Sequence, residues 1–96
     1  MAKLTDAEVA NALPGLPGWT YDGERISKEF TFPRFMEAIA FINRVADAAE
    51  AADHHPDLEN HYKSVLVSFR SWDAGGVTRR DLRMASATEA SVHPGD

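Results

Sequence analysis

The sequence predicts an α+β domain in which three helices lie on one face of a four-stranded antiparallel sheet, in the order α-β-β-α-β-β-α. Two observations support this prediction. Segments with apolar residues at helical spacing alternate with pairs of segments in which apolar residues occupy every second position. The strand–helix–strand crossover of a parallel sheet does not recur along the chain. At 96 residues, we expect one domain over 1–96, with 91–96 as a frayed tail.

The first helix is expected to begin after Thr5, because a threonine followed by Asp6 and Glu8 is typical of a helix N-terminus. Pro14-Gly15 ends this helix.

A hairpin is expected next. Trp19 and Tyr21 alternate with polar residues, and Asp22-Gly23 predicts a two-residue turn. The alternation resumes at Ile26, Lys28, Phe30 and Phe32.

A long helix is predicted over 33–53, with Pro33 in its first turn. His54-His55-Pro56 ends this helix, because a residue before a proline is pushed from helical toward extended geometry. Its apolar stripe is wider than one sheet can cover. We therefore expect this helix to contact either a second subunit or the domain's own terminal helices.

A third strand is expected by way of Leu58 and Tyr62. Strict alternation from Lys63 to Trp72 predicts the fourth strand. Gly75-Gly76 then ends this strand. Thr78 with Asp81 three residues later predicts a capping box at the start of the last helix.

Composition excludes several classes of protein. The chain has no cysteine, which removes disulfides, thiolate metal sites and cysteine nucleophiles. A net charge of -5 argues against direct nucleic-acid binding. No apolar run approaches the ~20 residues that span a membrane, and the first residues lack a signal core. We expect a cytoplasmic protein.

Three histidines, His54, His55 and His61, lie close together among acidic residues at a predicted helix-to-strand corner. General acid-base catalysis suits histidine, whose ordinary pKa of about 6.5 allows proton transfer near neutral pH. A metal site is a second interpretation, because His55, Asp57, Glu59 and His61 would share one face of an extended strand. That ladder would spread over roughly 20 Å, which is too far to surround one ion. The third interpretation is a solvated polar corner.

The run Glu50-Ala-Ala-Asp53-His54-His55-Pro56, followed by Tyr62, Trp72 and Asp81, resembles the signature of the pterin-4a-carbinolamine dehydratase family. The resemblance covers nearly the whole chain, from Gly18-Trp19 onward. It implies the same α+β fold and assembly into dimers or dimers of dimers, which we expect through the 33–53 helix and the sheet edges. It also implies dehydration of a 4a-hydroxytetrahydropterin to the quinonoid dihydropterin, without metal or organic cofactor. This reaction recycles the pterin cofactor of aromatic amino acid hydroxylases.

The resemblance also assigns roles to single residues. His54, His55 and Asp81 are the expected catalytic residues. The expected substrate-binding residues are both histidines with Glu50, Asp53, Arg70, Ser71, Trp72 and Asp73. Glu50 and Asp81 are expected to orient histidines or to contact ring nitrogens.

Trp72 departs from many animal members of the family, which have a third histidine at this position. Indole does not exchange protons near neutral pH, so we expect a retained but slower reaction in which His54 carries more of the work. The alternative is a non-catalytic interaction protein of the same fold, such as a transcription-factor dimerisation partner or a RuBisCO assembly factor.

Overall fold

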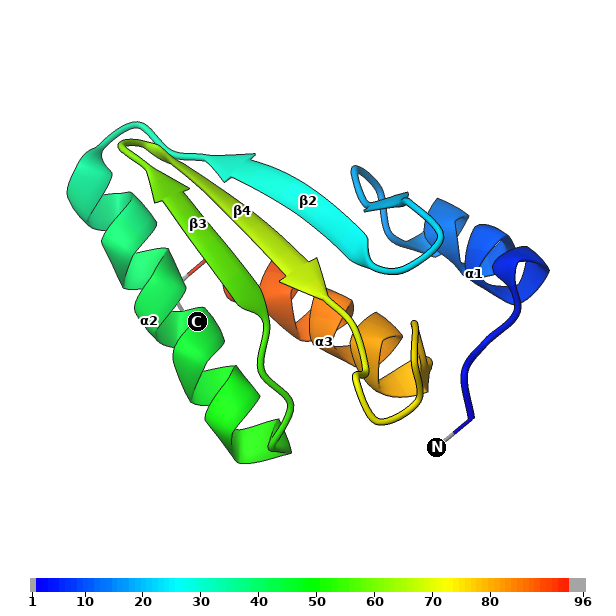
Figure 1. Ribbon diagram of the computed structural model, residues 1–96. Helices are drawn as coiled ribbons and strands as arrows, with labels where there is room; N and C mark the ends of the chain where they lie inside the picture. Colours follow the sequence, from blue (N-terminus) through cyan, green and yellow to red (C-terminus); the bar gives the residue numbers. More distant parts are fainter. Residues whose placement is uncertain (1, 94–96) are drawn as a thin grey trace.

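The structure is a computed structural model that describes residues 2–93. Its helices are α1 (Asp6–Ala12), α2 (Phe35–Ala52) and α3 (Arg79–Ala90), with a short 3₁₀ helix, η1 (Leu13–Gly15), after α1. The strands are β1 (Thr20–Tyr21), β2 (Ile26–Thr31), β3 (Asp57–His61) and β4 (Ser64–Phe69). They form one antiparallel sheet in the order β1-β2-β4-β3 (Figure 1). The predicted fold class is confirmed.

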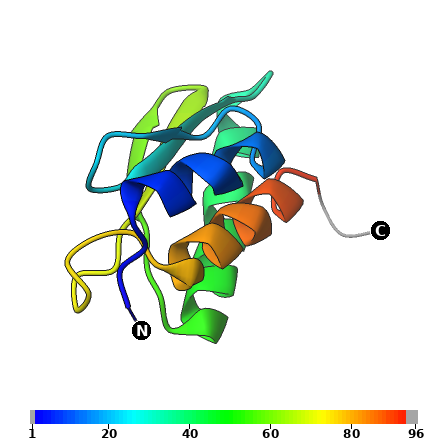
Figure 2. The same ribbon diagram turned by 90° about the vertical axis from the view of Figure 1, so that its right-hand side faces the viewer.

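The inner face of the sheet carries the core. Ile26 pairs with Phe69 and Phe30 with Val65, which puts apolar side chains of β2 and β4 on one side. The helices lie against this side (Figure 2), and α2 contributes the buried Phe41. The outer face is mainly polar, because residues at alternate positions of a strand point to opposite faces.

The predicted starts of the first and last helices are confirmed. Thr5 and Glu8 form a reciprocal capping box at α1, and Thr78 and Asp81 form another at α3. In each case two backbone N–H groups that the helix leaves free find acceptors on these side chains.

The predicted two-residue turn at Asp22-Gly23 is wrong. The last pair of the ladder is Tyr21 with Ile26, so four residues separate β1 from β2. The Asp22 carboxylate accepts hydrogen bonds from the backbone N–H groups of Glu24 and Arg25, at 2.9 and 2.8 Å. These bonds favour a wider loop, because the aspartate side chain folds back on the residues that follow it.

Other element ends also differ from the sequence expectation. Pro33 lies before the N-cap residue Arg34, so α2 begins at Phe35. The strand β4 ends at Phe69, because the chain closes a loop from Ser71 to Gly76 through a β-bridge. Of the expected frayed tail, residues 94–96 lie outside the described residues. The carbonyl of Ser91, by contrast, accepts a hydrogen bond from Arg44 at 2.7 Å.

The wide apolar stripe of α2 is only partly covered. Phe41, Val45 and Ala49 are buried in the domain's own core, whereas Phe35 and Met36 at the start of the helix are 41% and 68% exposed. Over residues 2–93, no helix combines the length and apolar character needed to cross a membrane.

Candidate functional site

Two consecutive histidines, His54 and His55, lie at the corner between the end of α2 and the start of β3. Asp53 adopts a left-handed conformation, with φ 51° and ψ 43°. The backbone N–H of His54 bonds to the carbonyl of Ala49 at 3.1 Å, and that of Asp53 bonds to Glu50 at 3.2 Å. These two bonds form a Schellman motif, in which glycine is the usual left-handed residue. The aspartate here therefore holds a conformation that a side chain disfavours.

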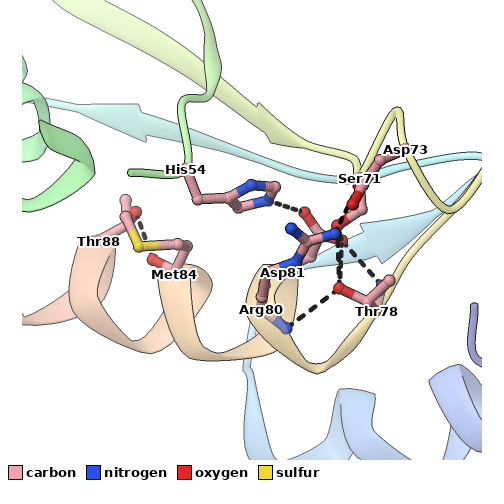
Figure 3. A network of polar contacts seen from close by, with 8 residues as sticks. All are labelled: His54, Ser71, Asp73, Thr78, Arg80, Asp81, Met84 and Thr88. Carbon is pink, nitrogen blue, oxygen red and sulfur yellow. Dashed lines mark hydrogen bonds and ion pairs between the residues drawn. The ribbon is translucent and has the colours of Figure 1, made fainter. Parts of the chain in front are cut away.

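His54 lies in the interior of the fold beside the start of α3 (Figure 3). Its side chain is 11% exposed, and its Nε2 lies 2.6 Å from Oδ1 of Asp81. Its ring stacks on Phe69, with ring centroids 6.2 Å apart and an interplanar angle of 20°. The packing and the hydrogen bond together fix the orientation of the imidazole.

Asp81 is completely buried and fully engaged by donors. Its Oδ2 accepts hydrogen bonds from the Ser71 hydroxyl and the Thr78 backbone N–H, each at 2.8 Å. The Thr78 hydroxyl lies 2.9 Å from that of Ser71 and completes the network (Figure 3). A buried carboxylate requires such compensation, because desolvation disfavours an unpaired charge.

This arrangement selects one tautomer of neutral His54. A carboxylate can only accept hydrogen bonds, so the hydrogen of the imidazole lies on Nε2 and is donated to Asp81. The lone pair is then on Nδ1. That nitrogen has no hydrogen-bond partner among residues 2–93. The nitrogen available for proton transfer is therefore Nδ1.

A cleft of about 290 Å³ opens beside this histidine. Its lining comes from the α2–β3 corner, the segment after β4 and the first turn of α3. The lining residues are Asp53, His54, His55, Arg70, Trp72, Asp73 and Arg80. The start of β3 and the end of β4 lie at the same end of the sheet, because Asp57 of β3 pairs with Ser68 of β4.

Most residues predicted for the site meet at this cleft. Glu50 lies outside its lining but is 3.4 Å from Nε2 of His55, which is half exposed. Ser71 and Asp81 are buried behind His54 and do not line the cleft. Sequence reasoning missed Arg80. Its position next to Asp81, seven residues after Asp73, was the available signal.

Arginine side chains surround the mouth of the cleft. Trp72 is 68% exposed, and the guanidinium of Arg70 lies 4.4 Å from its ring centroid. A second guanidinium, from Arg25 in the β1–β2 loop, lies 5.9 Å from the same ring. Such contacts stabilise an exposed indole in place, because the ring face attracts cations.

Arg80 binds Asp73 at 2.6 Å. The hydrogen bond from Arg80 holds the pKa of the Asp73 carboxyl below its usual value. This ion pair ties the Ser71–Gly76 loop to α3 and so fixes one wall of the cleft.

Within the described part of the chain, no three or more histidine and acidic side chains are grouped to hold a metal ion. Asp57, Glu59 and His61 do share the outer face of β3. A larger cavity, of about 460 Å³, lies between Pro33, Arg44 and Val92 and contains none of the predicted site residues.

The fold and the site define a class of small α+β proteins with an aspartate-oriented histidine beside an arginine-lined cleft. The family model described as pterin 4 alpha carbinolamine dehydratase matches residues 2–91. The chain therefore belongs to the pterin-4a-carbinolamine dehydratase family.

Curated relatives and solved structures agree with this placement. A protein of Rhizorhabdus wittichii named "Putative pterin-4-alpha-carbinolamine dehydratase" is 51% identical over 89 residues, 91% of this chain and 92% of the relative. A protein of the same name from Koribacter versatilis is 47% identical, with 95% and 96% covered.

The crystal structure of a transcriptional coactivator/pterin dehydratase from Brucella melitensis has a TM-score of 0.89 and 38% identity, covering 95% of this chain and 99% of the other. A pterin dehydratase-like protein identified as a RuBisCO assembly factor shares the fold, with a TM-score of 0.68 and 18% identity, over 81% and 93% of the two chains.

Proposed function

We propose that this protein catalyses the dehydration of a 4a-hydroxytetrahydropterin to the quinonoid dihydropterin and water. The observation that carries the proposal is the hydrogen bond between His54 and Asp81. It leaves Nδ1 of His54 without a partner among residues 2–93, beside a cleft lined by polar and charged side chains and by Trp72. Membership of a dehydratase family supports the reaction type. We place the reaction in the cytoplasm.

The reaction needs one acid and one base. The 4a-hydroxyl must gain a proton and leave as water when the C4a–O bond breaks, and the resulting cation must lose the proton on N5. Nδ1 of His54 takes the N5 proton, because Asp81 stabilises the imidazolium that forms. His55, whose side chain is 55% exposed, delivers the proton to the hydroxyl.

The remaining residues position the reactants. Asp81 acts through His54 and is a positioning residue, as is Ser71, since both are buried away from the cleft. Glu50 orients His55. The pterin lies among Asp53, Arg70, Trp72 and Asp73, with the two histidines. Positioned acid-base catalysis contributes about 10² to 10⁴ in rate, enough for a step that already proceeds slowly in water.

The test is the decay rate of the carbinolamine with the wild type, His54→Ala and His61→Ala. His61 is an exposed histidine on the outer face of β3, so its variant is a matched control. We expect acceleration by the wild type and His61→Ala, and about a hundredfold or greater loss in His54→Ala. Equal acceleration by all three proteins would show that His54 is not the catalytic base.

The family resemblance implies a histidine in many animal members where this chain has Trp72, and we expect the reaction to be slower for this reason. Trp72 is exposed at the mouth of the cleft, so Trp72→His places a third imidazole there. The smaller side chain leaves no cavity in the core. The variant should dehydrate the carbinolamine faster than the wild type. An unchanged or lower rate would assign Trp72 to substrate stacking instead.

The second candidate function is a non-catalytic interaction protein. It is favoured by the fold shared with the RuBisCO assembly factor and by the coactivator named in the Brucella structure. Titration with a reduced pterin analogue separates the two functions, since a site that does not bind the analogue would favour the scaffold. A neighbouring hydroxylase gene supports the enzyme, and neighbouring carboxysome genes support the assembly role.

Self-assembly into a dimer or tetramer belongs to the same proposal, through the 33–53 helix and the sheet edges. Phe35 and Met36 are exposed at the start of α2, and the Phe35 ring stacks on the exposed Tyr62, with centroids 6.3 Å apart. Tyr62 has φ 53°, which is unusual for a bulky residue. Replacing Phe35 and Met36 with serine should lower the mass measured by light scattering. A monomeric wild type would refute the assembly.

A further inference from the structure

We propose that the cleft continues behind His54 into an anion-binding crevice, and that the substrate is a pterin whose side chain carries an oxyanion, either phosphate or carboxylate. This inference rests on the proposed dehydratase function and deepens it. It assigns a specificity role to Arg83, a residue outside the machinery described above.

The crevice is a hollow of about 100 Å³ lined by Ala52, His54, Arg80, Arg83 and Met84. It shares His54 and Arg80 with the cleft, so these two side chains border both hollows. This volume is about a third of that of the cleft, about 290 Å³, so the crevice suits a side-chain substituent better than the bicyclic ring.

The charges that line the crevice have one sign. Arg80 and Arg83 lie three residues apart on α3 and so share one side of the helix. No carboxylate lines the hollow. Asp73 and Asp81 are engaged elsewhere, since Asp73 binds Arg80 outside the hollow and Asp81 binds His54. In a protein of net charge -5, two arginines in the lining of one small hollow are a local exception.

Both arginines keep donor capacity for a ligand. Arg83 is exposed and forms no ion pair with residues 2–93. Arg80 donates from Nη2 to Asp73, while its Nη1 forms no hydrogen bond with the same residues. Guanidinium groups match the paired oxygens of phosphate and carboxylate. The chemistry favours an oxyanion over a neutral hydroxyl.

The experiment compares two ligands that share one ring. The first is a 7,8-dihydropterin with a neutral trihydroxypropyl side chain, and the second is its monophosphate. Dissociation constants come from calorimetry on the full chain. Inorganic phosphate alone is the third probe, because it separates a site for free anions from a site for the substrate's side chain.

We expect the monophosphate to bind about tenfold or more tightly than the neutral ligand, and the difference to shrink as salt is raised. Arg83→Gln should abolish the difference while leaving the neutral ligand's affinity unchanged. Arg79→Gln is the matched control, because Arg79 is exposed on the same helix and lines a different hollow. It removes the same charge and should preserve the difference.

Each other outcome contradicts the inference in a distinct way. Equal binding of both dihydropterins to the wild type would refute the crevice and leave the dehydratase proposal standing. Binding of neither would refute both. An Arg83-dependent affinity for inorganic phosphate, without a preference for the phosphorylated pterin, would refute the substrate class and indicate a site for a free anion.

Discussion

Replacing Asp81 with asparagine separates the charge of this side chain from its shape. The amide has one oxygen and one NH₂ group, so it cannot accept hydrogen bonds at both ends. The Thr78 backbone N–H is a fixed donor at 2.8 Å and requires the oxygen. The NH₂ group of Asp81→Asn therefore faces His54, which must offer a lone pair at Nε2 and move its hydrogen to Nδ1. We therefore expect Asp81→Asn to fold close to the native structure, with the hydrogen of the His54 ring on Nδ1 instead of Nε2.

The magnitude follows from the bond that is lost. A hydrogen bond to a charged group contributes about 1.5–3 kcal/mol, and each 1.4 kcal/mol is a factor of ten. We expect kcat to fall about 10- to 150-fold, because the imidazolium formed during the reaction loses its stabilising carboxylate. KM should change little, since Asp81 is buried and does not line the cleft.

Two assays check this reasoning. Carbinolamine decay under saturating and limiting substrate gives kcat and KM separately, and nitrogen NMR of the His54 ring reports the tautomer. Ser71→Ala serves as a milder variant, because it removes one donor to Asp81 at 2.8 Å and keeps the charge. It should lower kcat less than Asp81→Asn does. Unchanged kcat with an altered tautomer, or a raised KM with unchanged kcat, would refute the positioning role.

Three further predictions concern the corner, the loop and the core. Asp53→Gly should raise the free energy of unfolding by up to about 1 kcal/mol, because glycine tolerates φ 51°, while lowering activity through loss of a cleft carboxylate. Urea denaturation and the decay assay measure the two effects. Arg80→Gln should raise the pKa of Asp73 toward its ordinary value, as followed by carboxyl NMR. The wild-type pair persists at neutral pH and is lost as the pH falls through the lowered Asp73 pKa. Phe41→Ala, at a fully buried ring, should destabilise the fold by about 3–5 kcal/mol, which a urea midpoint detects.

The sequence predicted what depends on local periodicity and capping. The order of elements, the N-cap at Thr5, the capping box at Thr78 and the inward side of β4 all follow from patterns within a few residues. The turn at Asp22 was missed because an aspartate side chain can either precede glycine in a tight turn or fold back onto the backbone. Residue type alone does not distinguish the two.

The sequence predicted which residues belong to the site but not how they are arranged in it. His54, His55, Trp72 and Asp73 were expected together, and they line one cleft. Which members face the substrate depends on tertiary burial, and this explains why Ser71 is enclosed behind His54. Arg80 reaches the site only because α3 packs beside the loop after β4, where it binds Asp73. No local sequence pattern encodes that tertiary contact.

One carboxylate in this fold has two tasks. Asp81 completes the cap of α3 through Thr78 and holds His54 through its other oxygen. Selection for folding alone would therefore retain an aspartate at this position, even in a descendant that had lost its chemistry. Its presence in a relative is poor evidence of catalysis. The imidazole takes no part in the cap of α3, and another side chain that donates to Asp81 could replace it in the fold. The loss of His54 is therefore the change that should mark a member of this fold that has become a scaffold.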